Sequence, residues 1–196
     1  MKKIAVTGGI GSGKSTVLKI LSDFGYPVFS CDEVYKEVIL DPVYIKKIYK
    51  NFPNCVENNI IDKKKLAKEV FSNSEKRARL NSIAHPMIIE LLLSKMKATP
   101  NDIAFAEVPL LFEENLESLF DGVIVVLRKE SDRIESICKR DNCTQKEALA
   151  RIAAQFDYQN WEKSNAFNQK GVYTLYNNDD VFQLKNETIS ILKNFL

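Results

Sequence analysis

The stretch that decides the fold is Val6-Thr7-Gly8-Gly9-Ile10-Gly11-Ser12-Gly13-Lys14-Ser15-Thr16. It holds four of the seven glycines in a chain of 196 residues, and these four lie within six positions. Gly8, followed after four residues by Gly13, Lys14 and Ser15, matches the glycine-rich loop that binds polyphosphates. Glycine leaves backbone N–H groups open to phosphate oxygens, because no Cβ stands in the way. Lys14 can reach the β- and γ-phosphates of ATP, and the Ser15 hydroxyl can ligate Mg²⁺.

The segments on either side of this loop predict a strand before it and a helix after it. Residues 3–7 form a short apolar run typical of a buried strand. After the loop, apolar residues recur at the spacing of one helix face up to Phe24, and Gly25 stands where a helix commonly ends. The alternative is a flexible turn with an incidental Gly-Lys-Ser, and the strand and helix around the loop argue against it. We therefore predict that the phosphates of a nucleotide are bound by Gly9, Ile10, Gly11, Ser12, Gly13, Lys14, Ser15 and Thr16.

The rest of the chain alternates between apolar runs and amphipathic segments. The apolar runs predict further strands at residues 26–30, 103–108, 122–127 and 172–176. Helical patterns are found at residues 131–141, 144–157 and 181–195. Thr144 and Glu147 have the spacing of a capping box. Uniformly apolar strands that alternate with helices are typical of a covered parallel sheet. We predict an α/β protein with the three-layer P-loop NTPase fold and a five-stranded parallel sheet.

An unusually long segment separates the second and third predicted strands. It spans about 65 residues, 33–97, where a parallel connection needs only one helix. Its pattern is helical, with breaks near residues 41–42, 51–54 and 72–74. We predict an inserted helical subdomain at this point.

The composition predicts a soluble globular protein and excludes several classes. Hydrophobic residues make up 45% and charged residues 28%, which excludes a disordered chain. A net charge of +2 offers no positive field for nucleic acid. No apolar run is long enough to span a membrane, and the opening Met1-Lys2-Lys3 does not lead into a signal peptide.

The cysteine and histidine content argues against a structural metal or a disulfide framework. The chain has four cysteines without a C-x-x-C pair, and its one histidine is His85. Neither zinc-ligand spacing nor a small disulfide-stapled fold fits these numbers. We expect reduced thiols and a cytoplasmic location.

Three further groups are candidates for chemistry. Asp32 ends the second predicted strand, where ligands bind in open α/β sheets, and is either a base for a substrate hydroxyl or an acid in the first turn of a helix. Arg133 and Arg140, seven residues apart on one helix, form either a basic face over ATP or a solvated charged surface. His85, followed by Pro86, is either a packed or capping group or a ligand contact.

Together, these motifs resemble the dephospho-CoA kinase family. The glycine-rich loop with its flanking residues resembles that family's P-loop, and Phe24-Gly25-x-x-Val28 with Asp32 resembles its second-strand motif. Two further stretches are similar to family signatures, Leu80-Asn81-x-Ile83-x-His85-Pro86 and Val108-Pro109-Leu110-Leu111-Phe112-Glu113. Two more are similar to its lid, Lys139-Arg140-Asp141 and Arg151-Ile152-Ala153-Ala154-Gln155. The matches run in order from residue 4 to about residue 155.

The resemblance implies a reaction and a division of the chain. The reaction is transfer of the ATP γ-phosphoryl group to the ribose 3′-hydroxyl of dephospho-CoA with Mg²⁺, which gives coenzyme A. The substrates are small molecules, no nucleic acid or membrane is a partner, and a monomer or weak homo-oligomer is expected. The implied parts are a core of about residues 1–32, 101–130 and 170–196, a helical CoA-binding subdomain of about 33–100 and a lid of about 131–169.

The resemblance also implies roles for individual residues. The implied catalytic residues are Lys14, Asp32 and Arg140, and Ser15 is the implied metal ligand. The residues implied at the acceptor substrate are Thr7, Asp32, His85, Pro109, Leu110 and Glu113. Asn177 is implied in nucleotide binding.

Two departures from the family pattern and two rival functions stay open. The family usually has Asp-Ala-Asp where this chain has Ser30-Cys31-Asp32, so only the second carboxylate is present. Near the C-terminus, Asn177 is kept from the family's I-x-N-x-G stretch but the glycine is missing. The rivals are another small-molecule P-loop kinase for nucleosides or nucleotides, and a GTPase-type switch. The second rival lacks the usual N/T-K-x-D guanine motif in this sequence.

Overall fold

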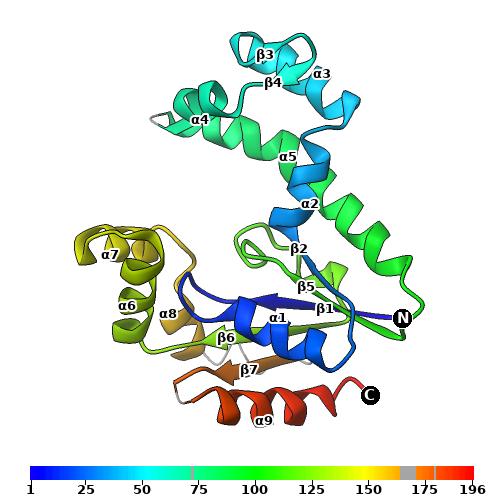
Figure 1. Ribbon diagram of the computed structural model, residues 1–196, viewed down its shortest axis with the longest axis vertical. Helices are drawn as coiled ribbons and strands as arrows, with labels where there is room; N and C mark the ends of the chain where they lie inside the picture. The colour runs from blue at the N-terminus through cyan, green and yellow to red at the C-terminus, as the bar shows by residue number, and fades with distance from the viewer. Residues whose placement is uncertain (72, 164–170, 179) are drawn as a thin grey trace. The chain divides into compact units, whose positions relative to one another are not determined.

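The computed structural model describes residues 1–71, 73–163, 171–178 and 180–196. The end of the expected lid, residues 164–169, and Asp179 lie outside the described residues. The chain forms two compact units, one of Met1–Phe29 with Thr99–Leu196 and one of Ser30–Ala98. Figure 1 labels their helices and strands.

The first unit is built on a five-stranded parallel sheet, which confirms the prediction from the sequence. In spatial order the strands are β2 (Val28–Ser30), β5 (Ile103–Glu107), β1 (Lys2–Thr7), β6 (Gly122–Leu127) and β7 (Val172–Tyr176). Ile4 of the central β1 pairs with Phe105 on one side and Gly122 on the other. The order places the loop after β1 in the middle of the edge where the carboxyl ends of the strands meet, the usual ligand site of such sheets.

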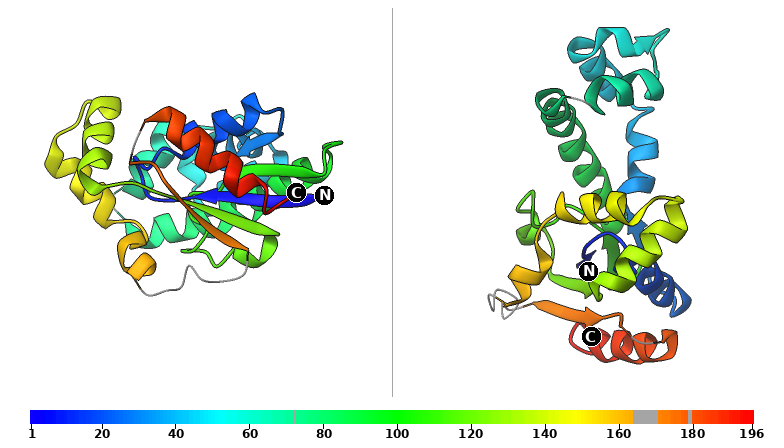
Figure 2. Two further views of the ribbon diagram at one scale, coloured as in Figure 1. Left: turned by 90° about the horizontal axis from the view of Figure 1, so that it is seen from below. Right: turned by 90° about the vertical axis from the view of Figure 1, so that its left-hand side faces the viewer.

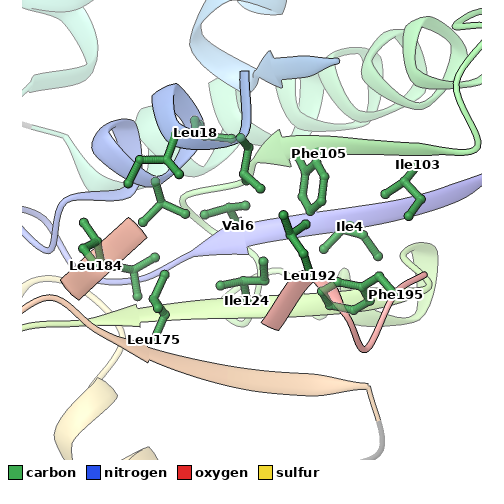
Figure 3. Close-up of a cluster of buried hydrophobic side chains, with 14 residues drawn as sticks. Ile4, Val6, Leu18, Ile103, Phe105, Ile124, Leu175, Leu184, Leu192 and Phe195 are labelled. Atoms are coloured by element: carbon green, nitrogen blue, oxygen red, sulfur yellow. The ribbon is translucent and has the colours of Figure 1, made fainter. Parts of the chain in front are cut away.

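Two helices cover one face of this sheet and form the main hydrophobic core. They are α1 (Lys14–Asp23) and α9 (Val181–Leu192), whose apolar side chains meet those of β1, β5, β6 and β7. Figure 3 shows Leu18 of α1 and Leu184 and Leu192 of α9 around Val6 and Ile124 of the sheet. The helix predicted after the glycine-rich loop is therefore confirmed. Val17, Ile20 and Leu21 of its predicted apolar face are buried, whereas Phe24, the C-cap residue, is 41% exposed.

Between β6 and β7, the described residues of the first unit form three helices: α6 (Glu130–Asp141), α7 (Gln145–Ala153) and α8 (Tyr158–Lys163). A short 3-10 turn, Glu117–Leu119, lies between β5 and β6. Figure 1 shows α6 and α7 beyond the carboxyl end of β6, and Figure 2 shows α8 on the sheet face opposite to α9. The capping box of Thr144 and Glu147 is present at the start of α7.

The prediction of one helix over residues 144–157 is wrong beyond Ala153. The backbone N–H of Phe156 donates to the side chain of Glu113, at 3.1 Å, rather than to a helical carbonyl. The ring of Phe156 also packs against Phe112, with 5.1 Å between ring centroids. These contacts hold the chain in a turn before α8 begins.

The second unit consists mainly of helices: α2 (Cys31–Val38), α3 (Pro42–Asn51), α4 (Lys63–Phe71) and α5 (Ser74–Lys97). The long α5 contacts each of the other three. Two of the predicted breaks coincide with helix caps, since Asp41 accepts from the first turn of α3 and Asn73 from the first turn of α5. No helix in the described parts of the chain is long and apolar enough to cross a bilayer.

The predicted helical pattern of residues 33–97, with its breaks, does not include a pair of strands that the structure contains. After a 3-10 turn, Pro53–Cys55, two short strands pair antiparallel, β3 (Val56–Glu57) and β4 (Ile60–Ile61). Asn58 and Asn59 between them have φ of 50° and 60°. Both angles suit the tight hairpin turn in which asparagine is favoured.

Candidate active site

The loop between β1 and α1 has the backbone that its glycines predict. Gly8, Gly11 and Gly13 have φ of 141°, 77° and 97°, a region that side chains disfavour. Gly13 is also the N-cap residue of α1, so the positive end of this helix faces the loop. Open amides and a helix N-terminus at one place form an anion-binding site.

Lys14 lies folded over the loop. Its Nζ donates to the backbone carbonyl oxygens of Gly8, at 2.8 Å, and Gly9, at 3.2 Å. The same Nζ is 4.0 Å from Oε1 of Glu107, the last residue of β5. Only 10% of the Lys14 side chain is exposed, so the ammonium is held in place by protein oxygens.

A pocket of about 220 Å³ opens in front of the loop, entirely within the first unit. Its lining comes from the loop and α1, from the ends of β5 and β6, and from α6. These residues are Gly11, Gly13, Lys14, Ser15, Thr16, Glu107, Arg128, Ser136, Ile137 and Arg140. Three of the side chains are cationic and one is anionic, which suits a polyphosphate. The structure thus brings five of the eight predicted loop residues and Arg140 to one pocket, whereas Gly9, Ile10 and Ser12 do not line it.

Arg128 and Glu107 belong to this pocket but are missing from the residues singled out in the sequence. The guanidinium of Arg128 donates through Nη1 to Ser136 Oγ, at 2.7 Å, and to the Gly11 carbonyl, at 3.4 Å. Each of the two residues lies at the carboxyl end of a strand, Glu107 as the last residue of β5 and Arg128 directly after β6. That position was the available signal, because ligands bind beyond the carboxyl ends of parallel strands.

Arg140 lies at the end of α6 and binds a neighbouring carboxylate. Its Nε and Nη2 donate to Asp141 Oδ1 and Oδ2, at 2.7 and 2.9 Å. This hydrogen bonding raises the pKa of the Arg140 guanidinium and lowers the pKa of the Asp141 carboxyl. Arg151 of α7 also donates to Asp141. Arg140 is therefore a cation that lines the pocket and is bonded to the carboxylate of Asp141 at the surface.

Arg133 does not lie beside Arg140. Both interpretations of the pair, as a basic face over ATP or as a solvated surface, required the two side chains to share one helix face. It is buried with 6% of its surface exposed, and its Nε donates to the Ile10 carbonyl at 2.9 Å. The interpretation of both arginines as one solvated surface is therefore wrong for Arg133. Ile10 in turn donates its backbone N–H to Gln155 Oε1, at 2.6 Å.

Asn177 supports the loop from the carboxyl end of β7. Its backbone N–H donates to the Leu127 carbonyl and its Nδ2 donates to the Ser12 carbonyl, each at 2.8 Å. A Cβ on Gly13 would lie 2.1 Å from this Nδ2. Gly13 is therefore required by the asparagine amide as well as by its own backbone angle.

The stretch after β5 packs on the start of α8. Glu113 accepts from the Phe156 N–H, and the Phe112 ring lies 5.2 Å from that of Trp161, centroid to centroid. In the same stretch Pro109 is half-buried and Leu110 is exposed.

Thr7, the last residue of β1, is buried, and its hydroxyl is hydrogen-bonded to the Tyr158 hydroxyl at 3.0 Å. Burial raises the pKa of Tyr158 to about 12, so both hydroxyls stay neutral. Through this pair α8 is attached to the strand that precedes the glycine-rich loop.

Asp32 and His85 belong to the second unit. Asp32 is in the first turn of α2, and its backbone N–H donates to Ser30 Oγ at 3.2 Å. Ser30 is thus the N-cap residue of α2, a role that serine fills as well as aspartate. His85 lies half-buried within α5, one residue before Pro86.

The sequence of the chain is similar to those of known dephospho-CoA kinases. A family model described as dephospho-CoA kinase matches residues 2–169. The dephospho-CoA kinase of Carboxydothermus hydrogenoformans is 38% identical over 158 residues, which cover 78% of this chain and 77% of the relative. That of Listeria monocytogenes is 30% identical over 201 residues, which cover 100% of this chain and 98% of the relative.

Solved structures agree in fold. A Thermus thermophilus protein has a TM-score of 0.82 at 28% identity, with 100% of this chain and 98% of that chain covered. The dephospho-CoA kinase from Campylobacter jejuni has a TM-score of 0.63 at 25% identity, with 98% of this chain and 96% of that chain covered. A shikimate kinase from Bacteroides thetaiotaomicron, with a TM-score of 0.55 at 12% identity, 99% of this chain and 98% of that chain covered, shares the fold alone.

Proposed function

The chain belongs to the dephospho-CoA kinase family, which phosphorylates dephospho-CoA with ATP in the last step of CoA biosynthesis, and we propose how its residues divide this work. The observation that carries the proposal is the 220 Å³ pocket in which Lys14, Arg128 and Arg140 meet the glycine-rich loop. Three cations and open backbone amides at one place match the charge of a triphosphate. The γ-phosphoryl group is transferred to the ribose 3′-hydroxyl of the acceptor.

The loop, Gly9 to Thr16, binds the phosphates of ATP. Loop amides other than those of Ile10 and Ser12, which donate to protein oxygens, bind phosphate oxygens, and Lys14 exchanges the carbonyls of Gly8 and Gly9 for β- and γ-phosphate oxygens. Positioning and charge neutralisation supply most of the rate in phosphoryl transfer, since the transition state needs little covalent help. Asn177 acts on ATP through the loop carbonyl that it holds.

The residues at the pocket fit Mg²⁺ bound together with ATP. Mg²⁺ is usually held by one or two protein oxygens, with substrate phosphates and water as its other ligands. Ser15 and Glu107 line the same pocket and offer a hydroxyl and a carboxylate. The described residues hold no cluster of three metal-ligating side chains, a donor set in keeping with an ion that arrives with its nucleotide. Ser15 would be the direct ligand, and an ion held there would supply positive charge to the phosphates.

Asp32 orients the 3′-hydroxyl and accepts its proton. Its place in the first turn of α2, directly after β2, supports this role, because acceptor groups bind at the carboxyl ends of parallel strands. Ser30 replaces the first carboxylate of the family motif and caps α2 instead, so Asp32 alone carries the base function. Thr7, His85, Pro109, Leu110 and Glu113 are the further residues of the acceptor side.

Arg140 neutralises the transferring phosphoryl group when a lid closes. The parts of the chain are a core of about residues 1–32, 101–130 and 170–196, a CoA-binding subdomain of about 33–100 and the lid of about 131–169. The exposed, bidentate bond to Asp141 supports such a role, because Arg140 can exchange one pair of oxygens for another at little cost. Closure also excludes water, which would otherwise accept the phosphoryl group.

The enzyme works as a monomer or weak homo-oligomer in the cytoplasm, with no nucleic acid or membrane partner. The net charge of +2 supports the absence of a nucleic acid partner. The four free cysteines support a reducing compartment.

A coupled ADP-release assay with dephospho-CoA, AMP and uridine as separate acceptors tests the proposal. We expect Mg²⁺-dependent release with dephospho-CoA that exceeds the other two by about a hundredfold or more. Lys14→Ala should nearly abolish release, whereas Lys19→Ala, which removes an exposed lysine from the same helix, should not change it. Equal rates with AMP would favour a nucleotide kinase, and a preference for GTP would favour a GTPase-type switch.

A further inference from the structure

The backbone of Ile10, at the tip of the glycine-rich loop, is held through both its N–H group and its carbonyl group. The carbonyl of Ile10 accepts from Arg133 Nε of α6, at 2.9 Å. The N–H of Ile10 donates to Gln155 Oε1, which follows α7, at 2.6 Å. Two side chains from separate parts of the sequence thus fix the two neighbouring peptide planes on either side of the Ile10 Cα.

Two glycines of the loop leave room for Arg133. A Cβ on Gly9 would lie 2.4 Å from Arg133 Nη2, and a Cβ on Gly11 would lie 2.8 Å from the Arg133 carbonyl oxygen. Gly11 has φ of 77°, so its backbone alone accounts for glycine. Gly9 is not among the residues with positive φ, so its backbone angle does not require glycine. At Gly9, the Arg133 guanidinium occupies the space that a side chain would take, so a larger residue there would have to displace it.

This placement of Arg133 is costly for the fold. The residue is 6% exposed. Burial lowers the pKa of its guanidinium, although the nearby carboxylate of Glu130 acts in the opposite direction. An apolar side chain of similar volume would fill the same space without desolvating a charge. What the arginine adds is a charge-assisted hydrogen bond to the loop and a rigid planar group against Gly9.

We propose that Arg133 is a positioning residue for ATP: it holds the tip of the loop through the Ile10 carbonyl and the space above Gly9, and so sets the affinity for the nucleotide. It reaches the substrate only through the loop. The inference rests on the proposed role of residues 9–16 in binding phosphate. It predicts weaker binding of both ATP and ADP, because both carry the phosphates that the loop surrounds, with no effect on the acceptor.

The first experiment compares full-length Arg133→Met with wild type by thermal unfolding, by calorimetric titration with ATP and with ADP, and by steady-state kinetics. We expect the Kd for ATP and for ADP to rise about tenfold, the effect of one lost charge-assisted hydrogen bond. The KM for dephospho-CoA should stay within about twofold. Lys139→Met, which removes an exposed cation from the same helix, is the matched control and should bind both nucleotides like wild type.

A mutant cycle tests the contact itself and stays informative if Arg133→Met folds poorly. Gly9→Ala should weaken ATP binding about fivefold or more in the wild-type background, because the new methyl group displaces the guanidinium. In the Arg133→Ala background the same change should cost less than about twofold, since the obstructing group is gone. Additive costs in the two backgrounds would overturn the proposal.

The outcomes separate this inference from the proposed function. An Arg133→Met enzyme with a lower unfolding temperature but an unchanged Kd for ATP has lost only a structural group, and the proposal is then wrong. If Lys14→Ala still weakens ATP binding in that case, the phosphate role of the loop stands. If Lys14→Ala leaves the Kd for ATP unchanged, the proposed function of the loop fails and this inference fails with it.

Discussion

Removal of Arg140 should reduce the turnover of this enzyme without unfolding it. The Arg140 side chain is 61% exposed and bonds to Asp141, whose side chain is 24% exposed. Exposed ion pairs add little to stability, so Arg140→Met should keep the unfolding temperature of the wild type. If the guanidinium neutralises the transferring phosphoryl group, its loss should lower kcat by about 10³-fold, which corresponds to about 4 kcal/mol of transition-state stabilisation.

The assay is steady-state ADP release with dephospho-CoA as acceptor, read as kcat and KM separately. Arg151→Met is the matched control, because Arg151 also donates to Asp141 and is 46% exposed, yet it does not line the pocket. We expect its kcat within about threefold of the wild type. A loss of less than about tenfold in Arg140→Met, or an equal loss in both variants, would refute a specific role of Arg140 at the phosphoryl group.

Three further predictions concern the base, the core and the pH dependence of stability. Asp32→Asn should lower kcat by about 10²-fold or more with an unchanged Kd for ATP in calorimetry, and a variant that keeps most of kcat would exclude Asp32 as the base. Leu175→Ala, at a core position 1% exposed, should lower the free energy of unfolding in urea by about 2–5 kcal/mol, and an unchanged midpoint would contradict the packing described for β7. Because the pKa of Tyr158 is raised to about 12, the folded state keeps a proton that the unfolded state loses above pH 10, so stability falls as the pH rises from 10 to 12. The amount by which the unfolding temperature of the wild type exceeds that of Tyr158→Phe should therefore decrease from pH 8 to pH 11. A constant difference would contradict the raised pKa of Tyr158.

The parts of the fold that the sequence predicts are those with local or periodic signals. The glycine-rich loop is a local pattern, and the structure has the backbone that the pattern requires at Gly8, Gly11 and Gly13. The apolar run of β6 predicted a buried strand, and all six of its residues are buried. The β3–β4 hairpin was missed because strands of two residues are too short to show alternation. Only the Asn58-Asn59 pair could have indicated it.

The site is predicted less completely, because its side chains meet through tertiary packing. Arg133 and Arg140 have the spacing of one helix face, but seven residues also separate them by about 10 Å along the helix axis. Arg133 therefore contacts the tip of the loop, and Arg140 lines the pocket. Glu107 and Arg128 join the pocket from the ends of two strands, and only that position distinguishes them in the sequence from other charged residues.

The contacts of Lys14 have a consequence for how the nucleotide is admitted. Its ammonium has already given up hydration to the Gly8 and Gly9 carbonyls, so an arriving phosphate does not have to strip water from it. To exchange the carbonyl oxygens for the more strongly charged phosphate oxygens, only the Lys14 side chain has to rotate. A ligand without such oxygens cannot replace the two carbonyl groups as acceptors for the Lys14 ammonium. The hydrogen bonds of Lys14 in the free protein therefore disfavour binding of uncharged molecules of similar shape.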